Sequence, residues 1–169
     1  ESLQYYLNQG HEGKVREADK RVDWRKLNEF SDSKTPPARL MKVLFNDEKW
    51  AADSVRQGSL MRNLYEVVIN MQSHDDGPDM LNLFTEEERY DQWCIANASW
   101  YVRYANSPMS DNAKPFSQYN LLRNFIELAD SCVALGKPQA TMRFGHEVCV
   151  MPLACLMELG NSNASIDES

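Results

Sequence analysis

The sequence predicts a mainly α-helical chain, and three of its features support this prediction. Apolar residues recur every three or four positions in several segments, which is the spacing of one helix face. Signals for helix starts and stops flank those segments. Only one short segment near the C-terminus has strand character. We therefore expect a helical region over residues 1–138, followed over residues 139–169 by a strand and a buried helix.

The composition is that of a globular chain and disfavours two classes of partner. Of the 169 residues, 43% are hydrophobic and 25% are charged, and no apolar run is long enough to span a bilayer. The formal net charge is -7, and the basic residues are scattered rather than clustered as phosphate binding requires. We expect neither a nucleic acid nor a membrane as a partner. The first ten residues lack the basic start and apolar centre of a secretory signal, so none exists or it was removed upstream.

No metal-binding pattern is present among the cysteines and histidines. The three histidines, His11, His74 and His146, lie far apart. No Cys-x-x-Cys pair occurs among the four cysteines, which are Cys94, Cys132, Cys149 and Cys155. We expect these cysteines to be buried free thiols, and we expect no metal and no cofactor.

Two helices are expected in the first half of the chain. Thr35, Pro36 and Pro37 begin the first, because threonine caps free amides and proline at the first helical position loses no hydrogen bond. The second ends by residues 73–79, where Gly77 and Pro78 do not continue a helix. Its apolar stripe has helical spacing and comprises Leu60, Met61, Leu64, Val67, Val68 and Met71.

A third helix begins at a capping box. In Thr85-Glu86-Glu87-Glu88 the Thr85 hydroxyl and the Glu88 carboxylate each satisfy a free backbone N–H group. The expected packed face of this helix comprises Tyr90, Trp93, Cys94, Asn97, Tyr101 and Tyr104. Because Asn97 lies on that face, we do not expect glycosylation at the acceptor sequence Asn97-Ala98-Ser99.

The last third of the chain predicts a helix, a strand and another helix. Apolar residues from Leu121 to Val133 mark the first helix, and Gly136 is placed to end it in the left-handed conformation. The short segment 139–144 suits a strand that ends in a tight turn. The nearly all-apolar residues 148–159 predict a buried helix. Because proline is tolerated only in a first turn, Pro152 places the start of that helix near residue 148 or 149.

His146 and Glu147 therefore lie between the end of the strand and the start of the helix. A helix start offers free N–H groups and the positive end of the peptide dipoles, which together favour an anion such as phosphate. There an imidazole can donate hydrogen bonds to a phosphoryl oxygen, and a neighbouring carboxyl group can pass a proton to a leaving alcohol. The alternative is that His146 only caps the helix or packs against its neighbours, and that Glu147 only interacts favourably with the helix dipole.

Five segments, taken in order, carry a resemblance to a known family. They are LMKVLF at 40–45, LFTEEE at 83–88, WYVRYANSP at 100–108, LLRNFIELAD at 121–130 and RFGHEVCVMPLACLMEL at 143–159. Together they resemble the histidine acid phosphatases, most closely the multiple inositol polyphosphate phosphatase (phytase) branch. The last segment is similar to that branch's Arg-Phe-Gly-His motif and the apolar run with Pro-Leu behind it. The resemblance covers roughly residues 36–159.

The resemblance implies a phosphomonoester hydrolase that transfers phosphate to a nucleophilic histidine and then to water, without a metal. It implies that His146 binds the phosphoryl group and that Glu147 is the proton donor. The inositol polyphosphate branch usually has His-Ala-Glu here, which places its acid at the position of Val148. Arg143 is a candidate contact to an inositol phosphate such as phytate, and candidate contacts from the helical cap are Lys42, Lys49, Arg56 and Arg62. The family also implies a periplasmic or secreted protein.

The nucleophile of this family lies in an Arg-His-Gly-x-Arg-x-Pro motif, and no Arg-His pair occurs in these residues. We therefore expect the C-terminal part of a phosphatase, whose parent fold is an α/β histidine phosphatase with an inserted α-helical cap. Its partners would be an inositol phosphate and the N-terminal part of the same protein, and the chain alone would be inactive. The absent motif also favours an alternative, a non-catalytic helical binding or assembly module that diverged from a phosphatase.

Overall fold

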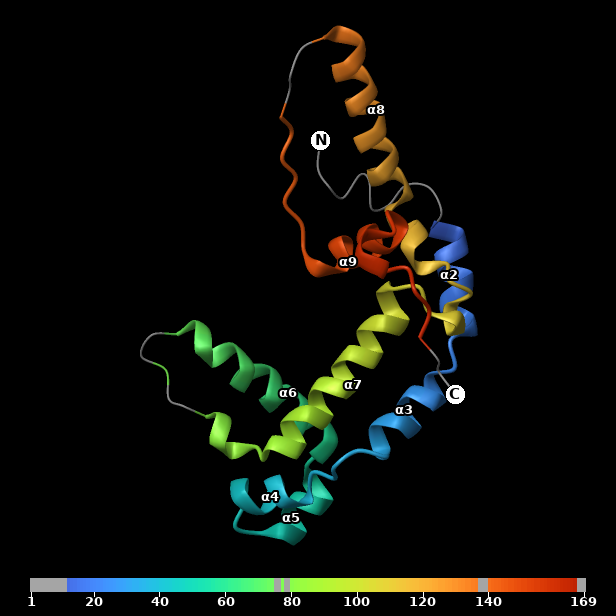
Figure 1. Ribbon diagram of the computed structural model, residues 1–169. Coiled ribbons are helices and arrows are strands. Elements are labelled where there is room, and N and C mark those ends of the chain that lie inside the picture. Colours follow the sequence, from blue (N-terminus) through green and yellow to red (C-terminus); the bar gives the residue numbers. More distant parts are fainter. Residues whose placement is uncertain (1–11, 75–76, 78–79, 137–139, 167–169) are drawn as a thin grey trace. The chain divides into compact units, whose positions relative to one another are not determined.

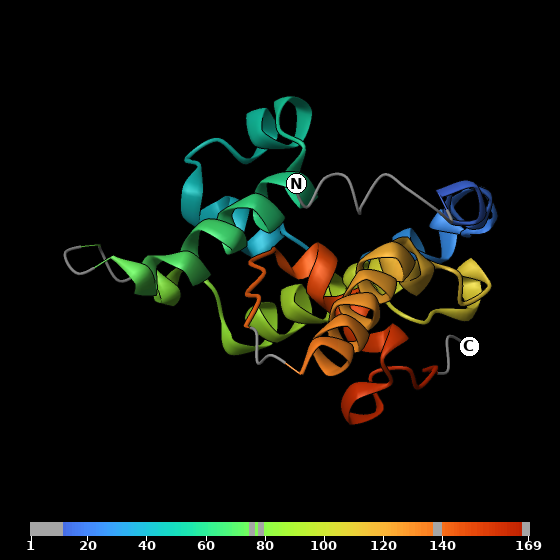
Figure 2. The ribbon, with the colours of Figure 1, turned by 90° about the horizontal axis from the view of Figure 1, so that it is seen from above.

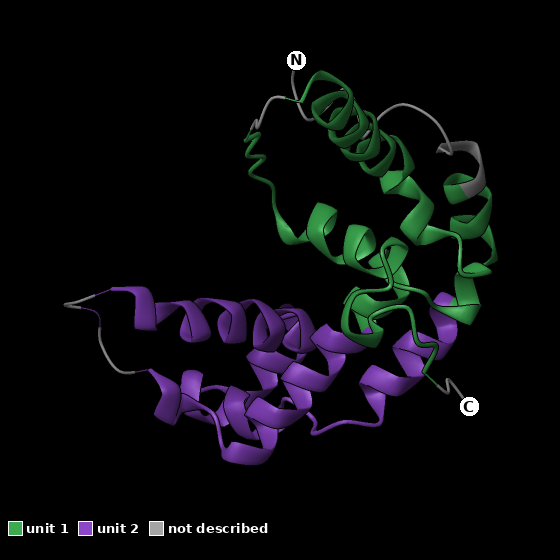
Figure 3. Ribbon diagram, turned by 45° about the horizontal axis from the view of Figure 1, so that its top comes forward, with its two compact units in different colours: residues 1–23, 99–169 green, residues 24–98 purple. Residues whose placement is uncertain are grey.

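The computed structural model is mainly helical, which confirms that the chain is mainly α (Figure 1). It describes residues 12–74, 77, 80–136 and 140–166. Among these residues none forms a β-strand, and no helix combines the length and apolar character needed to cross a membrane. The chain forms two compact units, one of residues 24–98 and one of residues 1–23 and 99–169 (Figure 3). The division predicted after residue 138 stays a prediction.

Four helices and the beginning of a fifth form the unit of residues 24–98. They are α3 (Trp24–Asp32), α4 (Ala38–Leu44), α5 (Glu48–Ser54), α6 (Gln57–Asn70) and α7 (Glu86–Tyr104), with 3-10 turns at Met71–Ser73 and Leu81–Leu83. The two helices predicted in the first half of the chain correspond to α4 and α6. Met61, Tyr65 and Val68 lie three and four residues apart on α6, so they share one face. That face joins a core completed by Leu40, Met41 and Phe84.

The start of α4 differs from the prediction at Thr35. The helix begins at Ala38, and its N-cap residue is Pro37. Thr35 does not cap it, because the Thr35 N–H group and hydroxyl both donate to Asp91 Oδ2, at 2.8 and 2.5 Å. Thr35 therefore ties the turn before α4 to α7.

The capping box at the start of α7 is confirmed. The Thr85 N–H group donates to Glu88 Oε2 at 2.9 Å, and the Glu88 N–H group donates to Thr85 Oγ1 at 3.1 Å. The predicted packed face is wrong at Tyr90, Trp93 and Asn97, whose side chains are exposed. The buried side chains in this part of α7 are the polar Glu88 and Gln92. Because Asn97 is exposed, packing is no argument against its glycosylation.

The other unit contains α2 (Glu12–Arg21), the end of α7, α8 (Tyr119–Leu135) and α9 (Glu147–Leu156). Three 3-10 turns join them, at Pro108–Ser110, Lys114–Gln118 and Leu159–Asn161. Helix α9 packs against α8 and the turn at Lys114–Gln118, and α2 packs against the first two turns. The buried side chains of this unit include Ala18, Val22, Leu121, Cys149, Pro152 and Cys155. Lys114 is also buried and forms an ion pair with Asp19.

Helix α8 ends as predicted, but the predicted strand after it is absent from the described residues. Gly136 has a φ of 59° and a ψ of 23°, the left-handed conformation that ends a helix. Residues 140–146 have no regular secondary structure and connect α8 to α9 (Figures 1 and 2). Gln139 lies outside the described residues. A strand is stabilised by hydrogen bonds to a neighbouring strand, and no described segment supplies one.

Helix α9 begins at Glu147, one or two residues before the predicted start. Pro152 is therefore the sixth helical residue instead of lying in the first turn, and it lacks the N–H group that would donate to the Val148 carbonyl. Its side chain is buried, as expected for an apolar helix. All four cysteines are free, and Cys149 and Cys155 are buried whereas the other two are part-exposed. Burial raises the pKa of both buried thiols.

Candidate functional site

The structure places His146 and Glu147 at the first positions of α9. His146 is the N-cap residue, with extended backbone, and its carbonyl accepts the N–H groups of Cys149 at 2.9 Å and Val150 at 3.1 Å. Glu147 is the first helical residue. The side chains of both residues are exposed. An imidazole and a carboxyl group therefore lie next to each other in the sequence, both open to a ligand.

The start of α9 has the electrostatic character of an anion site. No side chain caps the helix. The first N–H groups of an α-helix have no partner within the helix, and the positive end of the helix dipole lies there. The Glu147 carboxylate is stabilised by the same dipole, so its position suits a purely structural role as well. The geometry is compatible with both readings of the His-Glu pair.

Arg143, the predicted substrate contact, is held against α8. Its Nη2 atom donates to Asn124 Oδ1, and its guanidinium carbon lies 5.7 Å from the centroid of the Phe125 ring. Both partners belong to α8. Arg143 therefore anchors the segment that precedes α9, and a phosphate would compete with Asn124 for its guanidinium group.

The four candidate cap contacts belong to the unit of residues 24–98, whereas His146 belongs to the other unit. All four side chains, those of Lys42, Lys49, Arg56 and Arg62, are exposed. Lys42 forms an ion pair with Glu48 at 3.4 Å, and Arg62 lines a pocket. His11 lies outside the described residues. In the part of the chain that the structure describes, no group of three His, Cys, Asp or Glu side chains is placed to hold a metal ion.

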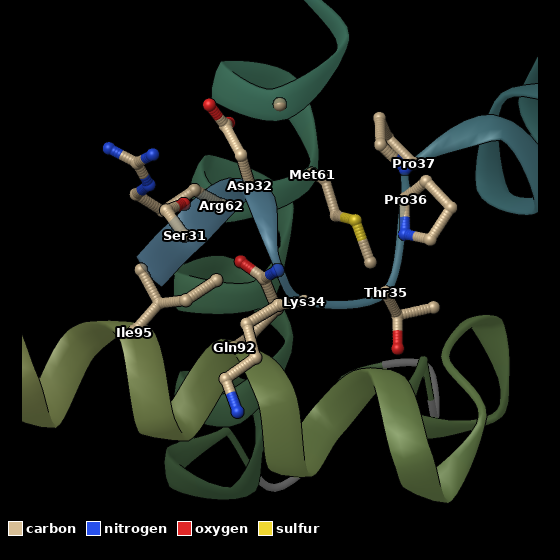
Figure 4. A pocket seen from close by; sticks show the side chains of 11 residues that line it. Ser31, Asp32, Lys34, Thr35, Pro36, Pro37, Met61, Arg62, Gln92 and Ile95 are labelled. Atoms are coloured by element: carbon tan, nitrogen blue, oxygen red, sulfur yellow. The ribbon is translucent and has the colours of Figure 1, made fainter. Parts of the chain in front are cut away.

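The pocket beside Arg62 was not predicted from the sequence. It has a volume of about 260 Å³ and lies between the end of α3, the turn before α4, and helices α6 and α7 (Figure 4). The amide group of Gln92 points into it from α7. Gln92 is only 6% exposed, but neither atom of its amide group is among the fully buried polar atoms that lack a hydrogen-bond partner. One sequence signal exists, because Gln92 follows the capping-box Glu88 by four residues and so shares its helix face.

The wall of the pocket before α4 is held rigidly. Asp91 accepts both hydrogen bonds from Thr35, and it lies 3.6 Å from the Lys34 ammonium group. The hydroxyl and backbone hydrogen bonds from Thr35, with the nearby charge of Lys34, lower the pKa of Asp91. Lys34 also lies over the Phe30 ring, 4.8 Å from its centroid. Lys34 lines the pocket, but its ammonium group interacts with Asp91 and Phe30, which do not line the pocket.

Two arrangements among the described residues have side chains suited to binding or catalysis. They are the start of α9 and the pocket around Gln92. Comparison with models of known protein families and with curated proteins finds no match for this chain. Its function is therefore inferred from residue chemistry, geometry and the resemblance of its motifs.

Proposed function

We propose that this chain is part of a histidine acid phosphatase that hydrolyses inositol phosphates, with His146 binding the phosphoryl group and Glu147 donating the proton. The observation that carries the proposal is the exposed His146–Glu147 pair at the uncapped start of α9. The five family-like segments, in the family's order, add to it.

The two side chains have different tasks in the proposed reaction. A histidine nitrogen supplied by another part of the protein attacks phosphorus, and the bond from phosphorus to the inositol oxygen breaks. His146 and the first N–H groups of α9 stabilise the charge on the phosphoryl oxygens. Protonated Glu147 gives its proton to the departing oxygen, and as a carboxylate it then takes a proton from the water that releases phosphate.

The surface of the segment before α9 is consistent with a chain that packs against more protein. Met142 is 79% exposed and Phe144 is 87% exposed, and Val133 of α8 is 82% exposed. Segment 140–146 has no regular secondary structure and no strand partner among the described residues. In the proposal this segment pairs with the α/β core, which covers these apolar side chains and converts the segment into a strand.

The proposal is tested by nuclear magnetic resonance of the histidine rings during titration with inorganic phosphate. His146 resonances should shift saturably, and those of His74, an exposed histidine of the other unit, should not shift. A His146→Ala variant should lose the saturable response. Equal shifts of His74 and His146 would contradict a phosphate site at α9.

The same exposed apolar side chains favour a second function, that of a helical binding or assembly module without catalysis. The two functions differ in what the start of α9 does. A module needs the apolar surface around Phe144 and makes no use of His146. Its binding to a protein partner would survive His146→Ala and would be weakened by Phe144→Ser, whereas the phosphatase proposal predicts that both changes impair activity.

A further inference from the structure

We propose that the pocket around Gln92 binds a small zwitterion, namely a free α-amino acid with an aliphatic side chain. The pocket lies wholly within the unit of residues 24–98 and involves neither His146 nor Glu147. The inference does not rest on the proposed phosphatase function, although Arg62 is also a candidate contact to an inositol phosphate. A volume of about 260 Å³ lies below the range of sites for drug-sized ligands and suits a molecule of amino-acid size.

The amide of Gln92 at the pocket surface is the first reason to expect a ligand. An amide group offers a ligand two N–H donors and a carbonyl acceptor. Gln92 is only 6% exposed, but its amide atoms are not among the fully buried polar atoms without a partner, so a ligand that forms hydrogen bonds with the amide can replace water there. Its amide points into the pocket, where a ligand can accept from the nitrogen and donate to the oxygen (Figure 4).

Two opposite charges at the pocket select a zwitterion over a simple anion. Arg62 and Asp32 both line the pocket, and within the described part of the chain neither has an ion-pair partner within 4.0 Å. Gly58 and Arg62 are four residues apart and share a face of α6, whose start no side chain caps. A ligand carboxylate therefore meets Arg62 and the positive end of α6, while its ammonium group meets Asp32. The Asp32 carboxylate opposes a polyanion.

The remaining surface of the pocket fits an aliphatic side chain. In Figure 4 the charged ends of Asp32 and Arg62 lie on one side, and Met61, Pro36 and Pro37 lie on the other. Met61 is fully buried and belongs to the hydrophobic core. Since the turn holding the prolines is tied to α7 through Thr35 and Asp91, this apolar wall is formed before a ligand binds.

The proposal is tested by titrating the whole chain, labelled in its methionine methyl groups, with L-leucine. The Met61 methyl resonance should shift saturably, and that of Met109 in the other unit should not shift. Two analogues serve as controls, 4-methylpentanoate without the ammonium group and 3-methylbutylamine without the carboxylate. Each should bind at least about tenfold more weakly, because hydrogen bonds to charged groups carry that much binding.

Matched variants locate the site. Arg62→Gln and Asp32→Asn should each weaken L-leucine binding about tenfold or more, whereas Arg56→Gln, on an exposed arginine outside the pocket lining, should leave it unchanged. Gly58 lines the pocket, and a Cβ atom there meets nothing within 4 Å. The ring of Gly58→Phe therefore has room to occupy the pocket, and this variant should abolish binding. Gln92→Met tests the amide directly. If that variant does not fold, the two surface variants still decide the question.

Three results would overturn the proposal. Equal binding of L-leucine and both analogues would show that the ammonium and carboxylate groups of the ligand do not contribute to binding. A saturable Met61 shift with inorganic phosphate, matching that with L-leucine, would identify an anion site instead. No Met61 shift with L-leucine up to about 50 mM, well beyond millimolar dissociation constants, would mean that the pocket binds no amino acid of this kind.

Discussion

Arg39 of α4 and Glu88 of α7 form an ion pair with two parallel hydrogen bonds. Arg39 Nε lies 2.7 Å from Glu88 Oε1, and Arg39 Nη2 lies 2.5 Å from Glu88 Oε2. Glu88 is 1% exposed, and its Oε2 atom also accepts the Thr85 N–H group. Arg39 Nη2 donates in addition to the Leu83 carbonyl at 2.6 Å. One buried carboxylate thus joins the start of α7 to α4.

Removing Arg39 should destabilise the chain strongly. Arg39→Met leaves the Glu88 carboxylate buried with only the hydrogen bond from the Thr85 N–H group, so the free energy of unfolding should fall by about 2–3 kcal/mol, as for loss of hydrogen bonds to a charged group. The matched control is Arg25→Met, which breaks the exposed Arg25–Glu29 pair and should cost less than about 0.5 kcal/mol. Urea unfolding measures both, and equal losses would contradict this role of the pair.

The stability of the chain should decrease in acid because of Glu88 and Asp91. Burial favours a higher pKa for Glu88, but the hydrogen bonds from Arg39 and Thr85 outweigh burial and lower its pKa from the ordinary 4.5. Hydrogen bonds from Thr35 lower the pKa of Asp91 from 3.8. A carboxyl group with a lowered folded pKa contributes stability that is present above its unfolded pKa and is lost as the pH falls through the folded value.

The melting temperature should therefore be nearly constant between about pH 5 and 8 and should fall as the pH is lowered below about 4. A Glu88→Gln variant, which is less stable at neutral pH, should show a shallower decline. Thermal unfolding followed by circular dichroism measures both profiles. An acid decline that is equally steep in Glu88→Gln would show that this carboxylate does not carry the effect.

Gly136 should be more sensitive to substitution than Gly58, although an added Cβ atom meets nothing within 4 Å at either position. Gly136 has a φ of 59°, where an L side chain is strained, so Gly136→Ala should destabilise by about 1 kcal/mol. Gly58 lies in the first turn of α6 without a positive φ, so Gly58→Ala should be neutral or slightly stabilising. Chemical unfolding of the two variants gives the comparison, and equal effects would contradict the strain argument.

Local signals in the sequence predicted several structural features correctly. The capping box of Thr85 and Glu88 and the left-handed end of α8 at Gly136 both depend on a few neighbouring residues, and both are present. The start of α9 was also placed within two residues, because apolar patterning marks the helix, although Pro152 lies beyond the first turn that was expected for it. Such features need no information about distant segments.

Features that depend on distant segments were not predictable. Thr35 was expected to cap α4, but its hydroxyl donates to Asp91, 56 residues away. The face of α7 was misassigned because polar Glu88 is buried by pairing with Arg39, while aromatic Tyr90 is 63% exposed. The pocket around Gln92 joins four elements, and the predicted strand at 139–144 depends on a neighbouring strand that no described residue supplies.

The isolated chain should have no phosphatase activity. In the proposed mechanism phosphate transfers first to a nucleophilic histidine, and the family's motif for that residue does not occur in these 169 residues. The measurement is hydrolysis of p-nitrophenyl phosphate by the purified chain. Turnover that disappears in His146→Ala would contradict this account, because it would place the nucleophile within the chain.

In the protein that the proposal requires, which combines this chain with the nucleophile, Glu147→Gln and His146→Ala should affect two substrates differently. An inositol oxygen needs a proton as it leaves, whereas p-nitrophenolate leaves almost unaided. Glu147→Gln keeps the size of the side chain and removes the transferable proton. His146→Ala removes a ligand of the phosphoryl oxygens, so it should slow both substrates together.

The most direct test of the proposed function is therefore the rate of phytate hydrolysis relative to that of p-nitrophenyl phosphate in Glu147→Gln. We expect phytate hydrolysis to fall on the order of a hundredfold or more, the usual contribution of general acid catalysis, while p-nitrophenyl phosphate hydrolysis falls much less. If the substitution slows both substrates equally, or neither, Glu147 is not the proton donor and the assignment of the His146–Glu147 pair is wrong.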